Sequence, residues 1–224
     1  MANYYNEKNI TKFVNALADY RDKVQHGESL NVSISAANSK MGAVSSVSLL
    51  PYLTCPYHCA ECYAAKLAAF RESVRNAYAK NTALAVEDPS AYFAQVRAAA
   101  MGVRFFRWHV SGDIINAHYF REMVYIAETL PRTEFLAFTK RYEIVNDFIK
   151  NGGAIPANLH IIFSVWDGVE MPNPYNLPTA AVVRPGCDPA DGWKICGGNC
   201  FECACRGVGC WELKKGETIA FKLH

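Results

Sequence analysis

Cys55-Pro-Tyr-His-Cys59-Ala-Glu-Cys62 brings three cysteines together at the spacing C-x3-C-x2-C. Upstream, residues 43–50 form a mostly apolar run that predicts a strand. Downstream, residues 63–80 contain no glycine or proline and are rich in alanine, leucine, arginine and lysine, which predicts a helix. We therefore expect the three cysteines on the loop between a strand and a helix.

Three thiolates on one short loop suit an iron–sulfur cube, because they hold three of its corners and leave one iron without a protein ligand. An open position of this kind also separates catalytic from structural zinc sites. The spacing favours an open cluster at Cys55, Cys59 and Cys62. The alternatives are a zinc knuckle and buried thiols that bind no metal.

The cysteine loop resembles that of the radical S-adenosylmethionine superfamily. The resemblance implies a [4Fe-4S] cluster on Cys55, Cys59 and Cys62, whose fourth iron takes the methionine end of S-adenosylmethionine. It also implies an electron donor such as flavodoxin or ferredoxin, and a substrate that the sequence does not identify. The superfamily often has an aromatic residue before the third cysteine, where this chain has Glu61. Tyr63 is the aromatic residue expected near the adenine.

A second resemblance begins at the segment Asn38-Ser-Lys-Met41. This segment, followed by the expected strand and the cysteine loop, resembles the opening of the phage gene product 88 family. The motif is less specific than the three cysteines.

Length and composition indicate a globular protein with an ordinary core. The chain has 224 residues, of which 51% are hydrophobic and 20% charged, and its net charge of +2 argues neither for nor against nucleic acid. It lacks an apolar run of about 18 residues that could span a membrane, and residues 1–20 do not read as a signal peptide. We expect a cytoplasmic protein that does not bind membranes.

Strand and helix patterns alternate after the cysteine loop. Strands are expected at 103–110, 134–138, 159–165, 179–183 and 218–223, and helices at 88–100, 116–130 and 142–151. Such alternation predicts an α/β fold with a mainly parallel sheet. Residues 44–186 allow about five units of roughly 30 residues, whereas a closed eight-fold barrel needs about 250.

We therefore expect an open, partial β/α barrel of about five to six mainly parallel strands over residues 44–186. Residues 1–43 should add a helix at 9–23 and a short strand at 31–35 that pack on this core. Residues 187–224 are expected to form a cysteine-rich, metal-binding extension.

The residues that follow each strand are candidates for a cofactor site, because β/α barrels place their catalytic residues at the C-terminal ends of the strands. Ser111-Gly112-Asp113 resembles the Gly-Gly-Glu motif with which the superfamily binds the amino group of S-adenosylmethionine. A glycine lets backbone approach a ligand, and a carboxylate pairs with an ammonium. The alternative is an ordinary strand-to-helix turn in which Asp113 is a helix cap.

Further candidates follow the next two strands. Thr139, Lys140 and Arg141 are candidates for the cofactor site, in which Lys140 or Arg141 could meet the carboxylate of the cofactor, although a solvated basic turn has the same appearance. The hydroxyl of Ser164 could bind the ribose. We expect His109, within a strand, to be a core residue rather than a ligand, and His58 to shield the cluster without ligating it.

Six of the nine cysteines lie near the C-terminus. They are Cys187, Cys196, Cys200, Cys203, Cys205 and Cys210. The surrounding glycines and prolines predict a loop with little core of its own, which a metal would order. Four thiolates close a zinc site or a second cluster, and we expect Cys187, Cys196, Cys200 and Cys203 to be those four. The resemblance favours a second [4Fe-4S] cluster over zinc.

Two functions are compatible with these patterns. The first is a radical S-adenosylmethionine enzyme, in which a reduced cluster cleaves the cofactor to methionine and a 5'-deoxyadenosyl radical that takes hydrogen from a substrate. The second is a non-catalytic module, stabilised by iron–sulfur or zinc, that binds nucleic acid or protein.

Overall fold

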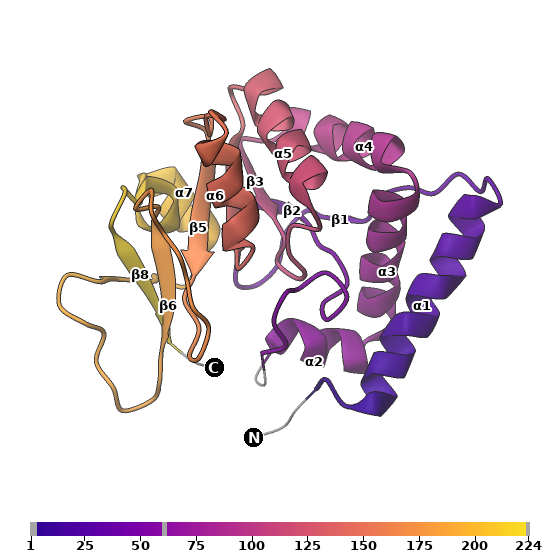
Figure 1. The fold of residues 1–224 in the computed structure, drawn as a ribbon, viewed down its shortest axis with the longest axis horizontal. Coiled ribbons are helices and arrows are strands. Elements are labelled where there is room, and N and C mark those ends of the chain that lie inside the picture. Colours follow the sequence, from indigo (N-terminus) through magenta and orange to yellow (C-terminus); the bar gives the residue numbers. More distant parts are fainter. Residues whose placement is uncertain (1–3, 60–61, 223–224) are drawn as a thin grey trace.

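The computed structural model describes residues 4–59 and 62–222, and its centre is one open sheet (Figure 1). Within these ranges the sheet has eight strands in the order β1-β2-β3-β4-β5-β6-β8-β7. The strands are β1 (Ile34–Ser35), β2 (Ser45–Val47), β3 (Phe105–Trp108), β4 (Glu134–Thr139), β5 (Leu159–Ser164), β6 (Thr179–Val183), β7 (Lys194–Ile195) and β8 (Thr218–Lys222).

Every pair of neighbouring strands is parallel except β1 and β2. The α/β class and the mainly parallel, open sheet are confirmed, whereas the curvature of a partial barrel stays a prediction. The described part of residues 44–186 contributes five strands, β2 to β6, within the expected five to six, and β1, β7 and β8 extend the sheet to eight. The last strand, expected over residues 218–223, lies between β6 and β7 and is described as far as Lys222, while Leu223 is outside the described residues.

Helices cover one face of the sheet. The helices are α1 (Glu7–Gln25), α2 (Tyr63–Phe70), α3 (Glu72–Glu87), α4 (Pro89–Met101), α5 (Ala117–Thr129), α6 (Tyr142–Lys150) and α7 (Cys200–Arg206). Alternate strand residues such as Phe106, Phe135 and Ile161 pack against α3, α4, α5 and α6. Figure 1 shows α1, in indigo, lying outside this layer along α3. No helix in the part of the chain that the structure describes could cross a membrane.

The opposite face of the sheet is covered by the cysteine-rich segment. Strand residues Phe105 and Leu136 pack there with Ala204 of α7 and with Trp211 of the short 3-10 helix Gly209–Glu212. The Trp211 and Phe105 rings are 5.2 Å apart. The expectation that this segment has little core is therefore wrong, because a tryptophan among the glycines anchors it to the sheet.

The helix expected over residues 63–80 is divided into α2 and α3. Arg71 between them has an extended backbone, with φ −113° and ψ 104°. The Arg75 side chain donates to the Ala68 carbonyl at 3.0 Å, and Lys12 donates to the Ala69 carbonyl at 3.4 Å. These bonds satisfy carbonyls at the end of α2 that would otherwise lack partners, so the helix can break without glycine or proline.

Candidate functional site

Three loops meet at the C-terminal edge of the parallel strands. The cysteine loop follows β2, Ser111–Asp113 follow β3, and Lys140 follows β4. Parallel strands end at one edge of a sheet, so the sequence prediction that these residues are neighbours is geometrically sound. Hydrogen bonds between the loops then fix their relative positions.

Asp113 joins the β3 loop to the end of β4. Its Oδ1 accepts from the Thr139 hydroxyl at 2.6 Å and from the Ile114 amide at 2.7 Å. Its Oδ2 accepts from the Lys140 amide at 2.9 Å. Burial raises the pKa of this carboxyl group, and the three hydrogen bonds oppose the rise. Asp113 is not the cap of α5, because Asn116 accepts from the Tyr119 amide in that role.

Ser111 and Gly112 attach the same loop to the segment that follows β2. The Ser111 hydroxyl donates to the Leu49 carbonyl at 2.9 Å, and the Leu49 amide donates to the Ser111 carbonyl at 2.9 Å. Gly112 has φ +83°, and a Cβ there would lie 2.7 Å from both the Leu49 Cβ and the Thr54 hydroxyl. Only glycine fits this close approach of the β3 loop to Leu49 and Thr54, and the approach brings Asp113 next to the start of the cysteine loop.

The three cysteines of the loop are each half-buried. Cys62 is the N-cap of α2, and its sulfur accepts from the Ala65 amide at 3.4 Å. Burial raises the pKa of Cys55 to about 12, and the charges of Asp113 and Cys62 add to the rise. Burial also raises the pKa of Cys59, against the opposing charge of Lys140. Without a metal, these surroundings favour the protonated thiols of Cys55 and Cys59.

An aromatic group backs the loop on the side of the N-terminal helix. The His58 ring stacks on Tyr52 with centroids 4.2 Å apart, and Tyr5 lies 5.2 Å from His58. Burial raises the pKa of the Tyr5 hydroxyl, and Cys62 raises it further. Tyr5 was missed at the sequence level, because no local pattern links it to a loop so distant in the chain.

Three other residues were predicted to contact the cofactor, namely Tyr63, Lys140 and Ser164, and each contacts a different part of the chain. The Tyr63 ring is 55% exposed, while its hydroxyl donates to the Val110 carbonyl. The Lys140 ammonium lies 5.1 Å from the centre of the Trp166 ring. Ser164 is half-buried at the end of β5, and its carbonyl accepts from Tyr142. Glu61, which precedes the third cysteine, is outside the described residues.

His109 is a core residue, as expected from the sequence. It is 3% exposed, and its Nε2 lies 2.9 Å from the Tyr119 hydroxyl, which lies 2.7 Å from that of Tyr92. Burial, and then the charge of Arg107, lower its pKa to about 3. The imidazole is therefore neutral at physiological pH.

Comparison with protein families supports one of the two resemblances. The family model described as gene product 88 matches residues 6–208. The chain belongs to the gene product 88 family. No curated protein and no solved structure matches it. The kinship with gene product 88 is thereby confirmed, and the radical S-adenosylmethionine resemblance stays a prediction.

The C-terminal cysteines of this gene product 88 protein divide by exposure. Cys187 and Cys205 are exposed, Cys196, Cys200 and Cys203 are half-buried, and Cys210 is buried. Cys187, one of the four expected ligands, is thus exposed, whereas Cys210 is buried in the same cluster as the middle three. Across residues 4–59 and 62–222, no three His, Cys, Asp or Glu side chains are already arranged to hold a metal ion.

Two surface cavities lie outside the cysteine loop. A groove of about 270 Å³ runs between the β1–β2 edge and α3, and is lined by uncharged residues that include Ser46, Ser48 and Tyr78. Val110 also lines this groove, and its carbonyl accepts from the hydroxyl of Tyr63, the residue that follows Cys62, so the groove reaches one end of the cysteine loop. Burial raises the pKa of Tyr78 to about 12.

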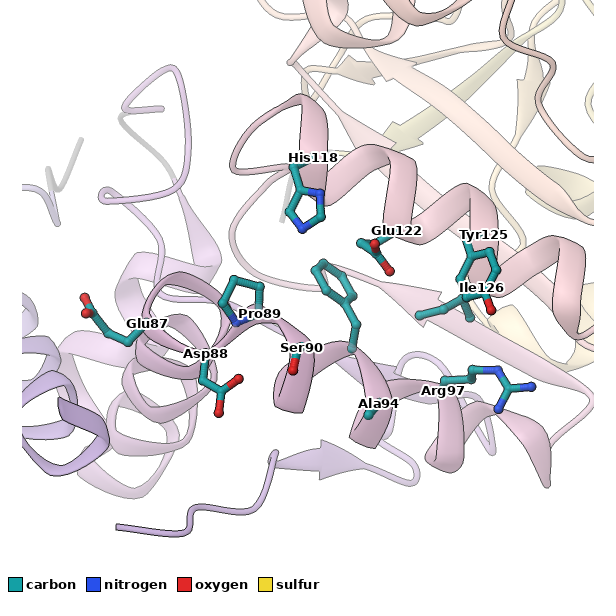
Figure 2. A pocket seen from close by; sticks show the side chains of 11 residues that line it. Glu87, Asp88, Pro89, Ser90, Ala94, Arg97, His118, Glu122, Tyr125 and Ile126 are labelled. Atoms are coloured by element: carbon teal, nitrogen blue, oxygen red, sulfur yellow. The ribbon is translucent and has the colours of Figure 1, made fainter. Parts of the chain in front are cut away.

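The larger cavity, of about 760 Å³, is remote from the cysteines. It lies between α4 and α5, where Figure 2 shows Arg97 on one helix and His118 and Glu122 on the other. Two of its acidic residues already have structural partners, since Glu87 accepts from Gln25 at 2.9 Å and Asp88 caps α4. Size alone therefore does not identify the functional site.

Proposed function

We propose that this protein is a radical S-adenosylmethionine enzyme whose open [4Fe-4S] cluster is held by Cys55, Cys59 and Cys62. The observation that carries the proposal is the gathering of these thiols with Asp113 and Lys140 at one edge of the sheet, where Asp113 and Lys140 are joined by a hydrogen bond and stand close enough for their charges to act on Cys55. A three-thiol loop beside a carboxylate and an ammonium suits a cofactor that itself carries an amino group and a carboxylate.

The donor set fits such a cluster. Thiolates are the ligands that iron–sulfur clusters use, and metal binding drives off their protons. The Cys62 sulfur stands at the N-terminus of α2, where amide groups and the helix dipole favour negative charge.

The bound cofactors would supply one-electron cleavage of S-adenosylmethionine to methionine and a 5'-deoxyadenosyl radical. The chain itself binds and orients. Lys140 offers an ammonium for the carboxylate of the cofactor, and the half-exposed Tyr63 ring offers a flat face for the adenine. Asp113 retains acceptor capacity for an amino group beyond the three bonds that hold it in place. Ser164 stays the candidate for the ribose.

The walls around the loop favour chemistry away from water. Tyr5, Tyr52 and His58 lie on one side of it, and the uncharged groove beside Tyr78 reaches Val110, whose carbonyl accepts from Tyr63 at the end of the loop. This groove is a candidate entry for a substrate without charge at the reacting end. The electron donor would be a separate protein, such as flavodoxin or ferredoxin.

The test is the formation of 5'-deoxyadenosine by anaerobically reconstituted, reduced protein given S-adenosylmethionine. We expect the nucleoside from the native protein and from Cys205→Ala, a matched control that removes an exposed cysteine. Cys59→Ala should make none and should lose about four irons, the content of one cube. A native protein that carries a full cluster but forms no nucleoside would support the rival function, a metal-stabilised binding module.

A further inference from the structure

The C-terminal segment repeats the spacing of the first cysteine loop. Cys196, Cys200 and Cys203 stand at C-x3-C-x2-C, as do Cys55, Cys59 and Cys62. Each motif leads into a helix, with Cys62 as the cap of α2 and Cys200 as the first residue of α7. The second motif differs in having a further buried cysteine close by.

The sulfur of Cys203 lies between two backbone segments that each carry another cysteine. A Cβ on Gly197, next to Cys196, would lie 3.5 Å from this sulfur, and a Cβ on Gly209, next to Cys210, would lie 3.4 Å from it. Cys200 lies one helical turn before Cys203 on α7, so their side chains share a face. The sulfur of Cys203 is thus close to the backbone beside Cys196 and Cys210 and shares a helix face with Cys200.

The fold fixes this group beneath the sheet. Cys210 is 8% exposed, and Cys196, Cys200 and Cys203 pack against the same core as Cys210. The Trp211 indole donates to the Cys200 carbonyl at 3.1 Å, which ties the 3-10 helix to the start of α7. The Cys196 amide donates to Ala220 of β8 at 2.9 Å.

A half-buried cation, Arg107, stands beside the group. Arg107, on β3, places its guanidinium 4.8 Å from the Phe138 ring, and its buried Nε has no hydrogen-bond partner. Burial and the neighbouring thiols raise the pKa of Cys200 and of Cys210, and the charge of Arg107 opposes the rise. A positive charge here would offset part of the negative charge that four thiolates bring to a metal.

We propose that Cys196, Cys200, Cys203 and Cys210 form a second metal centre that is closed by four thiolates, and that Cys187 and Cys205 are not its ligands. Because cysteine thiolates occupy every coordination position open to protein ligands, this centre does not bind substrate. It stabilises the segment or transfers electrons. The shared chemistry of a tetrathiolate site accommodates a [4Fe-4S] cluster or zinc. The proposal is independent of the function proposed for the first loop.

The test uses the full chain with Cys55, Cys59 and Cys62 all replaced by Ala, so that only the second centre can hold metal. Iron, sulfide and zinc are measured per chain after anaerobic reconstitution. We expect metal to remain in this background and in its Cys187→Ser and Cys205→Ser derivatives. Cys210→Ser and Cys200→Ser should each lose at least 80% of it.

Circular dichroism controls for folding, and the half-buried Cys200 gives a second variant if replacement of the buried Cys210 unfolds the segment. Iron with sulfide, or zinc without sulfide, satisfies the proposal. Absence of both metals from the background protein overturns it. The proposal is also overturned if Cys187→Ser or Cys205→Ser loses as much metal as a folded Cys200→Ser protein.

Discussion

At the scale of single residues, Asp113 holds the candidate site together and leads to a test of that role. Asp113→Asn must turn its NH2 toward either the Ile114 amide or the Lys140 amide, because each carboxylate oxygen accepts from one of them. We expect a loss of about 1–3 kcal/mol in the free energy of unfolding, the cost of an unsatisfied buried group. Urea titration measures the change.

The matched control for this substitution is Asp88→Asn. Asp88 caps α4, where its Oδ1 accepts from the Ala91 amide at 3.0 Å, and asparagine caps helices as well as aspartate. We expect almost no change for the control. Equal stability of Asp113→Asn and the native protein would show that the three hydrogen bonds do not matter.

The buried His109 predicts a pH dependence of stability. Its pKa falls from about 6.5 in the unfolded chain to about 3 in the fold. As the pH falls, the unfolded state therefore takes up the proton before the folded state does. The contribution of the neutral His109 to stability is complete above pH 6.5 and is lost as the pH falls toward 3. From pH 7 to 5 the expected loss is about 2 kcal/mol.

His109→Asn removes the titrating group and keeps a residue that tolerates the observed φ of +54°. The variant should be less stable than the native protein at both pH values. Between pH 7 and 5, however, its free energy of unfolding should fall by about 2 kcal/mol less than that of the native protein. His26→Asn, at an exposed ring, is the control. An unchanged pH slope in His109→Asn would contradict the assignment of a neutral, buried imidazole.

At the level of single residues, the sequence was sufficient to predict which residues follow the strands at the candidate site. It placed Ser111, Asp113 and Lys140 near the cysteines because parallel strands end at one edge. It did not reveal that Asp113 binds Thr139, which depends on the register of β3 and β4. Arg107 and Tyr5 escaped notice because their roles depend on contacts with distant parts of the chain.

At the scale of elements, the turn after β3 depends on Gly112. Gly112→Ala combines a left-handed backbone with overlap of Leu49 and Thr54, and should destabilise the fold by about 2–5 kcal/mol. Gly152→Ala is the control, since Gly152 has φ +85° but open space around it, and should cost about 1–2 kcal/mol. Thermal unfolding compares them. Equal melting temperatures would mean that the close approach is unimportant.

Elements with strong local signals were predicted well, and those set by tertiary contacts were not. Helix α4 begins after Asp88 with Pro89 in its first turn, as the sequence indicates. The break at Arg71 carries no local signal, because Arg75 and Lys12 satisfy the freed carbonyls from outside α2. Helix α7 was hidden by the many glycines and cysteines around it.

At the scale of the whole molecule, alternation of strands and helices was sufficient to predict the class and the parallel sheet. The short strand expected at residues 31–35 is present as β1, although only Ile34 and Ser35 pair with β2. The two-residue strand β7 exists only through pairing with β8, so periodicity could not find it. The sequence also underestimated the C-terminal segment, since Trp211 gives it a core on the second face of the sheet.

The central claim is that the Cys55–Cys62 loop holds a cluster with one iron open to S-adenosylmethionine. The most direct measurement is the electron paramagnetic resonance spectrum of the reduced, reconstituted protein before and after addition of S-adenosylmethionine. We predict that the cofactor shifts the signal of this cluster in the native protein, and that the shift is absent when Cys55, Cys59 and Cys62 are Ala. A spectrum that saturating S-adenosylmethionine leaves unchanged, in protein with its full iron and sulfide, would contradict the account.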